Sequence, residues 1–251
     1  MTDMATYGDN LLDYDRLEKL IQDSAVAYRT AKPFPHIVID DLLSTEVVDY
    51  LVRRMPEPEP QKAQGGASYL QMPDGTPAQS GKQWVSRELS VDVAFRRLYW
   101  ELNAGPFVRF LQRLTGVPRL LPDPYLLGGG IHQTLPGGYL AVHADFNKHP
   151  DLDLERRLNV LIYLNRDWPE SYGGELELWS TDMSRCEQKI APLAGRCVIF
   201  NTTSTSFHGH PHPLACPEGE TRKSIALYYY SRSEEHEQEH ETLWQQLPGE
   251  G

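Results

Sequence analysis

The feature that most constrains the fold is a series of short apolar or alternating runs that begins near residue 124. Turn-forming clusters such as Pro136-Gly137-Gly138 and Tyr172-Gly173-Gly174 separate these runs. The loops are too short for the crossover helices that parallel strands need. We therefore predict an antiparallel sandwich or barrel with strands in LLGGGIHQT, GYLAVHAD, RLNVLIYLN, GELELW, RCVIFNTT and RKSIALYYYS.

The first 120 residues carry mainly helical patterns. Apolar residues recur at helical spacing in 10–30, after Ser44, and again from 93 to 114, where the pattern ends near Gly116 and Pro118. A short strand, PFPHIVIDD, precedes Ser44, which is a good helix N-cap residue. We expect one folded unit, 1–251, in which helices of 1–120 support an all-β part at 121–232 and 233–251 is a polar tail.

A long segment rich in proline and glycine, 56–83, interrupts the helical part. Loops of this length within a compact domain are either disordered or functional, and a functional one is often a lid over a site. A disordered surface loop and a lid that closes over substrate remain the two interpretations of this segment.

The overall charge and composition exclude several classes of protein. The net charge is −11 and the isoelectric point is near 5.3, so the chain lacks the positive field that attracts nucleic acid. We find no apolar run long enough to span a membrane and no secretion signal at the N-terminus. Three widely spaced cysteines favour reduced thiols and a cytoplasmic location. No feature indicates an oligomeric state.

The run GYLAVHADFN contains a candidate metal site. His143 and Asp145 are two positions apart on a predicted strand, so their side chains point to the same face. His208 follows the later strand RCVIFNTT and could supply a third ligand from a neighbouring strand. Two histidines and one carboxylate on one face of a metal form the arrangement found in non-heme Fe(II) oxygenases.

Five motifs in order extend this pattern. The segments HAD, RRLNVLIYLNRDW, YGGELELW, FHGHP and TRKSIALYYYS, with a looser echo at PFPHIVIDDLLS, closely resemble the 2-oxoglutarate and Fe(II)-dependent dioxygenases of the prolyl-4-hydroxylase-like group over about 124–231. The resemblance implies a double-stranded β-helix (jelly roll) core. It also implies His143, Asp145 and His208 as ligands of Fe(II), 2-oxoglutarate as cosubstrate, and O2 as oxidant. Halogenating relatives replace the carboxylate by a small residue, so Asp145 favours hydroxylation.

The far carboxylate of 2-oxoglutarate requires a cation, and a planar guanidinium suits it best. Arg222 begins the last predicted strand, where strand parity puts Ser224 on the same face and Lys223 on the other. Arg222 therefore resembles the carboxylate anchor of the family, with Ser224 adding a hydroxyl. Tyr163 matches a family position that hydrogen-bonds the same carboxylate.

Three further residues are expected around the cosubstrate. Leu161 shares the face of Tyr163, and it and Leu176 are expected to wall the 2-oxoglutarate. Gln133, in the run before the HxD strand, is the candidate for contact with the carboxylate nearest the iron.

Several histidines compete with this assignment. His210 and His212 follow His208 at two-residue spacing, but the small residue and proline after the family's distal histidine favour His208. We interpret His132 as a substrate-side or structural residue. The tail holds a literal HExxH, at 236–240, but its neighbours are polar, so we predict a solvated helix there rather than a zinc site.

The compact chain suggests a small-molecule substrate, such as an amino acid derivative or a natural-product intermediate, hydroxylated at an unactivated C–H bond with release of succinate and CO2. A prolyl residue in a protein or peptide is the alternative that the resemblance implies. A metal-binding protein or isomerase of the cupin type, without oxygen chemistry, is the third interpretation. The nucleic-acid demethylases of the superfamily carry a second arginine where this chain has Tyr228. Together with the negative net charge, this difference argues against a nucleic-acid substrate.

Overall fold

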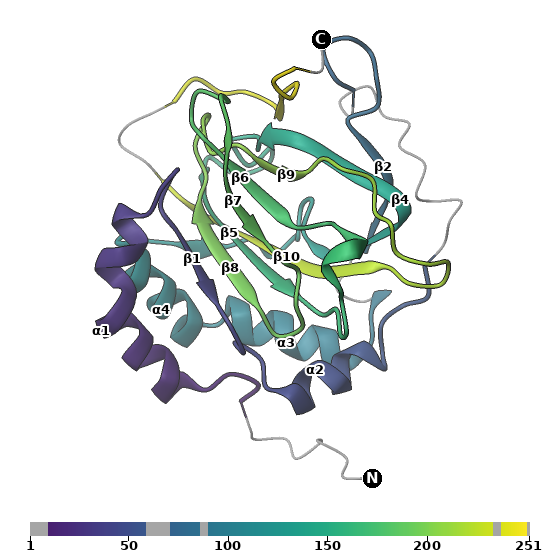
Figure 1. The fold of residues 1–251 in the computed structure, drawn as a ribbon. Helices are drawn as coiled ribbons and strands as arrows, with labels where there is room; N and C mark the ends of the chain where they lie inside the picture. The colour runs from purple at the N-terminus through teal and green to yellow at the C-terminus, as the bar shows by residue number, and fades with distance from the viewer. Residues whose placement is uncertain (1–9, 59–70, 86–89, 233–236, 250–251) are drawn as a thin grey trace.

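The computed structural model describes residues 10–58, 71–85, 90–232 and 237–249. Four α-helices precede most of the sheet (Figure 1): α1 Tyr14–Thr30, α2 Thr45–Val52, α3 Val93–Asn103 and α4 Gly105–Thr115. The strands are β1 His36–Ile39, β2 Gln79–Val85, β3 Leu121–Pro122, β4 Gly130–Ala144, β5 Glu155–Tyr163, β6 Leu176–Trp179, β7 Cys186–Ile190, β8 Cys197–Asn201, β9 His208–His210, β10 Arg222–Ser231 and β11 Leu243–Trp244.

Local sequence explains where the helices begin and end. The Ser44 hydroxyl accepts a hydrogen bond from the Val47 amide at the start of α2, and Gly116 ends α4 with a left-handed φ of 81°. The helical stretch predicted at 93–114 is two helices rather than one. Ala104 is extended and separates them, and Pro106, which lacks an amide proton, is tolerated in the first turn of a helix but not in its interior.

The strands form one curled antiparallel sheet in the order β1-β8-β5-β10-β4-β9-β6-β7, and β2, β3 and β11 pair at its sides. This confirms the predicted antiparallel fold of the jelly-roll type. The turn predicted at Pro136–Gly138 is wrong, because β4 runs through it. The first half of β4 pairs with β10, and its second half pairs with β9 after a shift of register. Gly138 permits this close passage, since a Cβ there would lie 2.8 Å from the Ser80 carbonyl oxygen.

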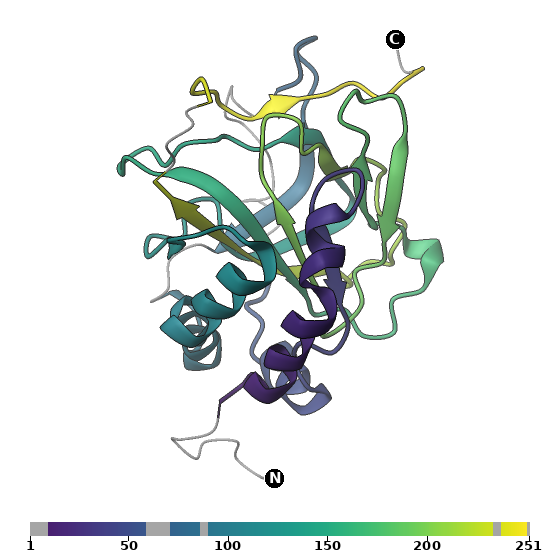
Figure 2. The ribbon, with the colours of Figure 1, turned by 90° about the vertical axis from the view of Figure 1, so that its left-hand side faces the viewer.

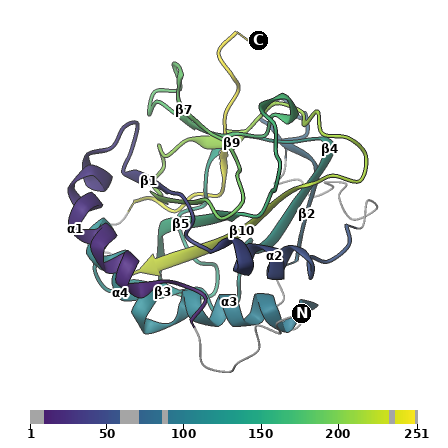
Figure 3. The same ribbon diagram turned by 60° about the horizontal axis from the view of Figure 1, so that its bottom comes forward.

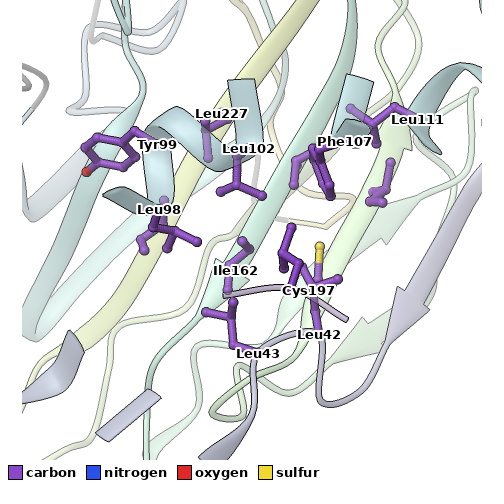
Figure 4. Packing of buried hydrophobic residues seen from close by; sticks show 14 of the residues in the cluster. Leu42, Leu43, Leu98, Tyr99, Leu102, Phe107, Leu111, Ile162, Cys197 and Leu227 are labelled. Atoms are coloured by element: carbon purple, nitrogen blue, oxygen red, sulfur yellow. The ribbon is translucent and has the colours of Figure 1, made fainter. Parts of the chain in front are cut away.

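Two apolar clusters lie on opposite faces of the larger half of the sheet. The helices pack against the outer face of β5, β8 and β10 (Figures 1 and 3), where Leu102, Phe107, Ile162 and Cys197 are fully buried (Figure 4). A smaller cluster fills the inside of the curl and includes Tyr163, Leu176 and Phe200. The interior of the curl, and not the helical layer, therefore holds the predicted site residues.

Two segments differ from the sequence predictions or lie partly outside the structure. Residues 59–70 of the proposed lid are outside the described residues, and its last part is strand β2, which pairs with β4. The tail from residue 237 is extended rather than helical, so the solvated-helix prediction is wrong for the part of HExxH that is described. It contains β11, which pairs with β4 at the end of the sheet far from the N-terminal helices (Figure 2). None of the helices described here is both long and apolar enough to cross a membrane.

Candidate functional site

The structure brings His143, Asp145 and His208 together inside the curl. His143 and His208 face each other across paired strands β4 and β9, and Asp145 directly follows β4. One ligand atom from each residue can be chosen so that all three lie within 4.8 Å of one another. The Asp145 carboxylate oxygens are 3.6 Å from His143 Nε2 and 3.5 Å from His208 Nε2. We call these three residues the triad.

Both imidazoles are held in the tautomer that a metal ligand needs. Nδ1 of His143 donates to the Ala141 carbonyl oxygen and Nδ1 of His208 donates to the Ser206 carbonyl oxygen, each at 2.9 Å. The Nε2 lone pair of each ring is therefore directed at the triad centre. Burial lowers the pKa of His208 to about 4, so this ring is neutral and able to coordinate at physiological pH.

Two neighbours fix the Asp145 carboxylate. Asn159 donates from Nδ2 to Asp145 Oδ2 at 2.8 Å, and a terminal guanidinium nitrogen of Arg156 lies 3.1 Å from the same oxygen. Burial alone would raise the pKa of Asp145, but Arg156 and the two imidazoles lower it well below its ordinary value. Arg156 is itself buried, 3.5 Å above the ring of Tyr228. The carboxylate is thus ionised and held in one orientation.

Arg222 and Tyr163 form the deep end of the site. Both are buried, and a terminal nitrogen of Arg222 donates to the Tyr163 hydroxyl at 3.4 Å. Nε of Arg222 donates to the Gly174 carbonyl oxygen at 2.6 Å. A Cβ on Gly174 would lie 3.0 Å from Cδ of Arg222 and 2.5 Å from Leu214. Gly174, the second glycine of YGGELELW, therefore gives Arg222 both an acceptor and room.

The remaining predicted residues divide into two groups. Ser224 lies opposite Tyr163 in the pairing of β10 with β5, and Leu161 and Leu176 belong to the apolar cluster inside the curl. Gln133 is not brought to the site. It pairs with Lys223 on the other face of the strands, and its amide is hydrogen-bonded to Thr221 and to the Pro56 carbonyl.

The inward positions next to Gln133 belong instead to His132 and Thr134, which are paired with Ser224 and Arg222. His132 is buried, and its Nε2 has no hydrogen-bond partner in the described structure. His210 is also buried on the inner face of β9, outside the triad. His212 is exposed and lies near Glu177. The structure thus groups His208, and neither of the other two, with His143 and Asp145.

A cavity of about 850 Å³ lies in front of the triad. Its walls include His143, Asp145 and Arg156 from the core, Lys82 and Trp84 from β2, and residues 239–242 and Trp244 from the tail. Sequence reasoning missed both outer walls. The polar pattern of β2 hid its strand character, whereas Leu243-Trp244 and Leu247, apolar residues in a polar tail, were a signal that this segment packs on the domain.

We call residues 237–249 the C-terminal strap. The buried side chain of Asn147 donates to the Gln238 carbonyl and accepts from the His240 amide. Further along, the Trp244 ring lies 4.8 Å, centroid to centroid, from the ring of His143. The strap therefore covers one side of the triad.

Comparisons with known proteins agree with this geometry. A sequence model described as the 2OG-Fe(II) oxygenase superfamily matches residues 129–230, which contain the whole triad. Among solved structures, a prolyl hydroxylase from Trichoplax adhaerens, in complex with a hypoxia-inducible-factor peptide, superposes with a TM-score of 0.54 at 17% identity. That match covers 86% of this chain and 91% of the other.

Two further structures are similar to this chain. A 2OG-Fe(II) oxygenase family oxidoreductase from Burkholderia pseudomallei has a TM-score of 0.52 at 17% identity, covering 85% of this chain and 90% of that one. HygX from Streptomyces hygroscopicus, with nickel, 2-oxoglutarate and hygromycin B bound, has a TM-score of 0.51 at 14% identity, covering 83% and 86%. At these identities the superpositions show a shared fold. Residues 129–230 thus match the sequence model of the 2OG-Fe(II) oxygenase superfamily, whose enzymes act with Fe(II), 2-oxoglutarate and O2, and most of the chain shares the fold of such enzymes.

Proposed function

We propose that this enzyme hydroxylates a small molecule and that the triad holds its Fe(II). The convergence of His143, Asp145 and His208 at one point carries the proposal. The donor set fits the ion, because two neutral imidazoles and one carboxylate form a facial triad that leaves other positions open. When bound, Fe(II) supplies the oxidation of a C–H bond at the expense of 2-oxoglutarate and O2, with succinate and CO2 as products.

The other residues of the site then have distinct tasks. Arg222 and the Tyr163 hydroxyl would receive the far carboxylate of 2-oxoglutarate, and Ser224 would add a hydroxyl beside them. Leu161 and Leu176 would keep water from the cosubstrate. Arg156 and Asn159 would hold the Asp145 carboxylate in the orientation that coordination requires.

The form of the cavity supports a small-molecule substrate. A volume of about 850 Å³ is within the usual range for sites that enclose drug-sized ligands. The strap and β2 form its outer walls, so the space in front of the triad is bounded on several sides. The similarity of fold to HygX, whose structure contains hygromycin B, is compatible with such a substrate.

A protein or peptide prolyl residue is the second candidate, favoured by the similarity of fold to the Trichoplax enzyme in its peptide complex. The two candidate substrate classes can be distinguished by which compounds raise the rate of succinate formation above the rate measured without substrate. The enzyme with Fe(II) and 2-oxoglutarate would be given a library of amino acids and small metabolites, and separately a library of proline-containing peptides. We expect stimulation by members of the first library. Stimulation by peptides alone would assign the second function.

A further inference from the structure

Lys82 is a cation of the cavity wall that has no role in the proposed chemistry and no ion pair among the described residues. In the sheet register, Lys82 of β2 lies opposite Thr134 of β4, and Thr134 lies opposite Arg222 of β10. Paired residues share a face, so Lys82 points into the curl on the same side as Arg222. It lines the cavity together with His143 and Asp145, whereas Arg222 and Tyr163 are buried and do not belong to the lining.

The ammonium group of Lys82 has no hydrogen bond and no ion pair within the described part of the chain. The other cations around the site are all engaged: Arg156 with Asp145, Arg222 with Gly174 and Tyr163, and Lys148 with Glu239 at 3.9 Å. The pKa of Lys82 is lowered to about 8, mainly by burial. Repulsion from Arg222 and Arg156 also lowers the pKa, whereas attraction by Asp145 raises it. A cation placed in this way lacks an anionic partner.

A second polar atom beside Lys82 also lacks a partner. His132 is paired with Trp84 on β2, two residues from Lys82, and it lines the same cavity. Its buried Nε2 makes no hydrogen bond among the described residues. Two adjacent unpartnered polar groups, facing one cavity, indicate that a polar part of a ligand binds at this wall.

We infer that Lys82 binds a carboxylate of the substrate, which makes the substrate an organic acid such as an amino acid or an acylated amino acid. The inference rests on the proposed function. The two anionic ends of 2-oxoglutarate already have partners there, namely Fe(II) and the pair Arg222 and Tyr163. One ammonium matches the single charge of a carboxylate, and it lies where a substrate in the outer cavity would meet it.

The test is a binding measurement on the holoenzyme under nitrogen, loaded with Fe(II) and 2-oxoglutarate. The probes are the common L-amino acids and their N-acetyl derivatives, and each acid is compared with its primary amide. Isothermal titration calorimetry measures the binding. We expect at least one acid to bind and its amide to bind at least tenfold more weakly. For that acid, Lys82→Met should raise the dissociation constant by roughly 10- to 100-fold, the loss of one charge-assisted hydrogen bond.

Lys148→Met is the matched control, because Lys148 lines the same cavity but is paired with Glu239. It should leave the affinity for the acid within about twofold, since exposed ion pairs contribute little. Both variants should bind 2-oxoglutarate as the wild type does, which also shows that they are folded.

Three results would overturn the inference: no acid in the panel binds, amides bind as tightly as acids, or Lys82→Met leaves the affinity for the acid unchanged. A loss of 2-oxoglutarate affinity in Lys82→Met, with the acid unaffected, would also overturn it and assign Lys82 to the cosubstrate. A wild type that binds no 2-oxoglutarate at all is a different result, because it contradicts the proposed function itself.

Discussion

Arg222 lies at the deep end of the site because a residue without a side chain leaves space for it. Its Nε donates to the Gly174 carbonyl, and its terminal nitrogen reaches Tyr163. Lys223, the next residue, has the same sign of charge but faces away and donates to the Thr221 carbonyl. Substitutions of these two neighbours therefore distinguish the effect of losing a positive charge near the site from the effect of losing the Arg222 side chain itself.

Arg222→Ala should raise the dissociation constant for 2-oxoglutarate at least tenfold while metal binding persists. Removing one partner of a sheltered carboxylate pair costs about 2–5 kcal/mol, or roughly 30- to 5,000-fold. Arg222→Lys should be intermediate, because an ammonium keeps the charge but loses the planar fork. Lys223→Ala should bind normally. Calorimetry with 2-oxoglutarate checks all three, and normal binding by Arg222→Ala would contradict the assigned anchor.

Gly174→Ala should weaken 2-oxoglutarate binding by displacing Arg222. The added Cβ would lie 2.5 Å from Leu214 and 3.0 Å from Arg222, so the guanidinium must move. Gly173→Ala is the matched control, since both glycines have positive φ but a Cβ on Gly173 meets nothing within 4 Å. Each variant should lose about 1–3 kcal/mol of unfolding free energy from backbone strain. Only Gly174→Ala should also lose cosubstrate affinity; equal losses in both would refute the contact argument.

Affinity for the organic acid proposed as substrate should fall as pH rises through about 8. Lys82 has a pKa lowered to about 8, so its ammonium is present below that pH and is lost above it. The charged groups that act on it are Asp145, Arg222 and Arg156, and none of these loses its charge between pH 7 and 9 by its ordinary pKa. The neighbouring imidazoles of His132 and His210 are neutral over this range, because burial lowers the pKa of each well below its ordinary value. Titration of the wild type and Lys82→Met at several pH values checks this. A pH dependence that survives in Lys82→Met would show that another group is responsible.

At the scale of residues, strand parity was a sound guide wherever the strand was regular. It placed His143 and Asp145 on one side and separated Arg222 from Lys223. The expectation for Gln133 came from the resemblance and not from parity, and β4 changes register between Gln133 and the HxD pair. The pairing with β10, which no pattern within β4 itself reveals, turns Gln133 outward.

At the scale of elements, strands with strong apolar patterns were predictable and those made by pairing alone were not. The cores of β5, β8 and β10 lie within predicted runs. Strands β7 and β9 are short or polar, and the pairing with β6 holds both of them. Strand β2 and the strap likewise take their form from β4. A segment whose backbone is hydrogen-bonded to a neighbouring strand can be a strand without a high β-propensity in its own sequence.

Removing the strap should open the site without unfolding the core. Its contacts with the domain include the pairing of β11 with β4, the Asn147 hydrogen bonds and the packing of Leu243 and Leu247, and they lie at the rim of the sheet rather than in the main apolar core. A chain ending at residue 236 should therefore stay folded by circular dichroism. It should release more succinate in the absence of substrate, because water reaches the site more readily.

Trp244→Ala should show the same increase in substrate-free succinate release, because the indole covers His143. Leu247→Ala, in the same strap but outside the cavity lining, is the control and should stay near the wild type. Unchanged release in both the truncated chain and Trp244→Ala would show that the strap does not shield the triad.

At the scale of the whole molecule, metal binding and unfolding should be coupled. A divalent ion that binds only the native state adds about 2.7 kcal/mol at a hundredfold excess over its dissociation constant, which for a chain of this size is roughly 5–10 °C in Tm. We expect this rise with Fe(II) under nitrogen and its reversal by a chelator. His208→Ala should lose it, while His210→Ala and His212→Ala keep it. Loss in His210→Ala with retention in His208→Ala would reassign the ligand.

The pairing of His143 with both His208 and Trp244 has a consequence for the order of events during folding. Each pair joins parts of the chain that are far apart in sequence, and such contacts form late because the intervening chain must first be ordered. A nascent or partly folded chain therefore presents scattered histidines rather than a chelating centre. If the triad holds Fe(II) as proposed, its complete donor set forms only once β4 and β9 have paired, so iron binding would report on the closure of the sheet.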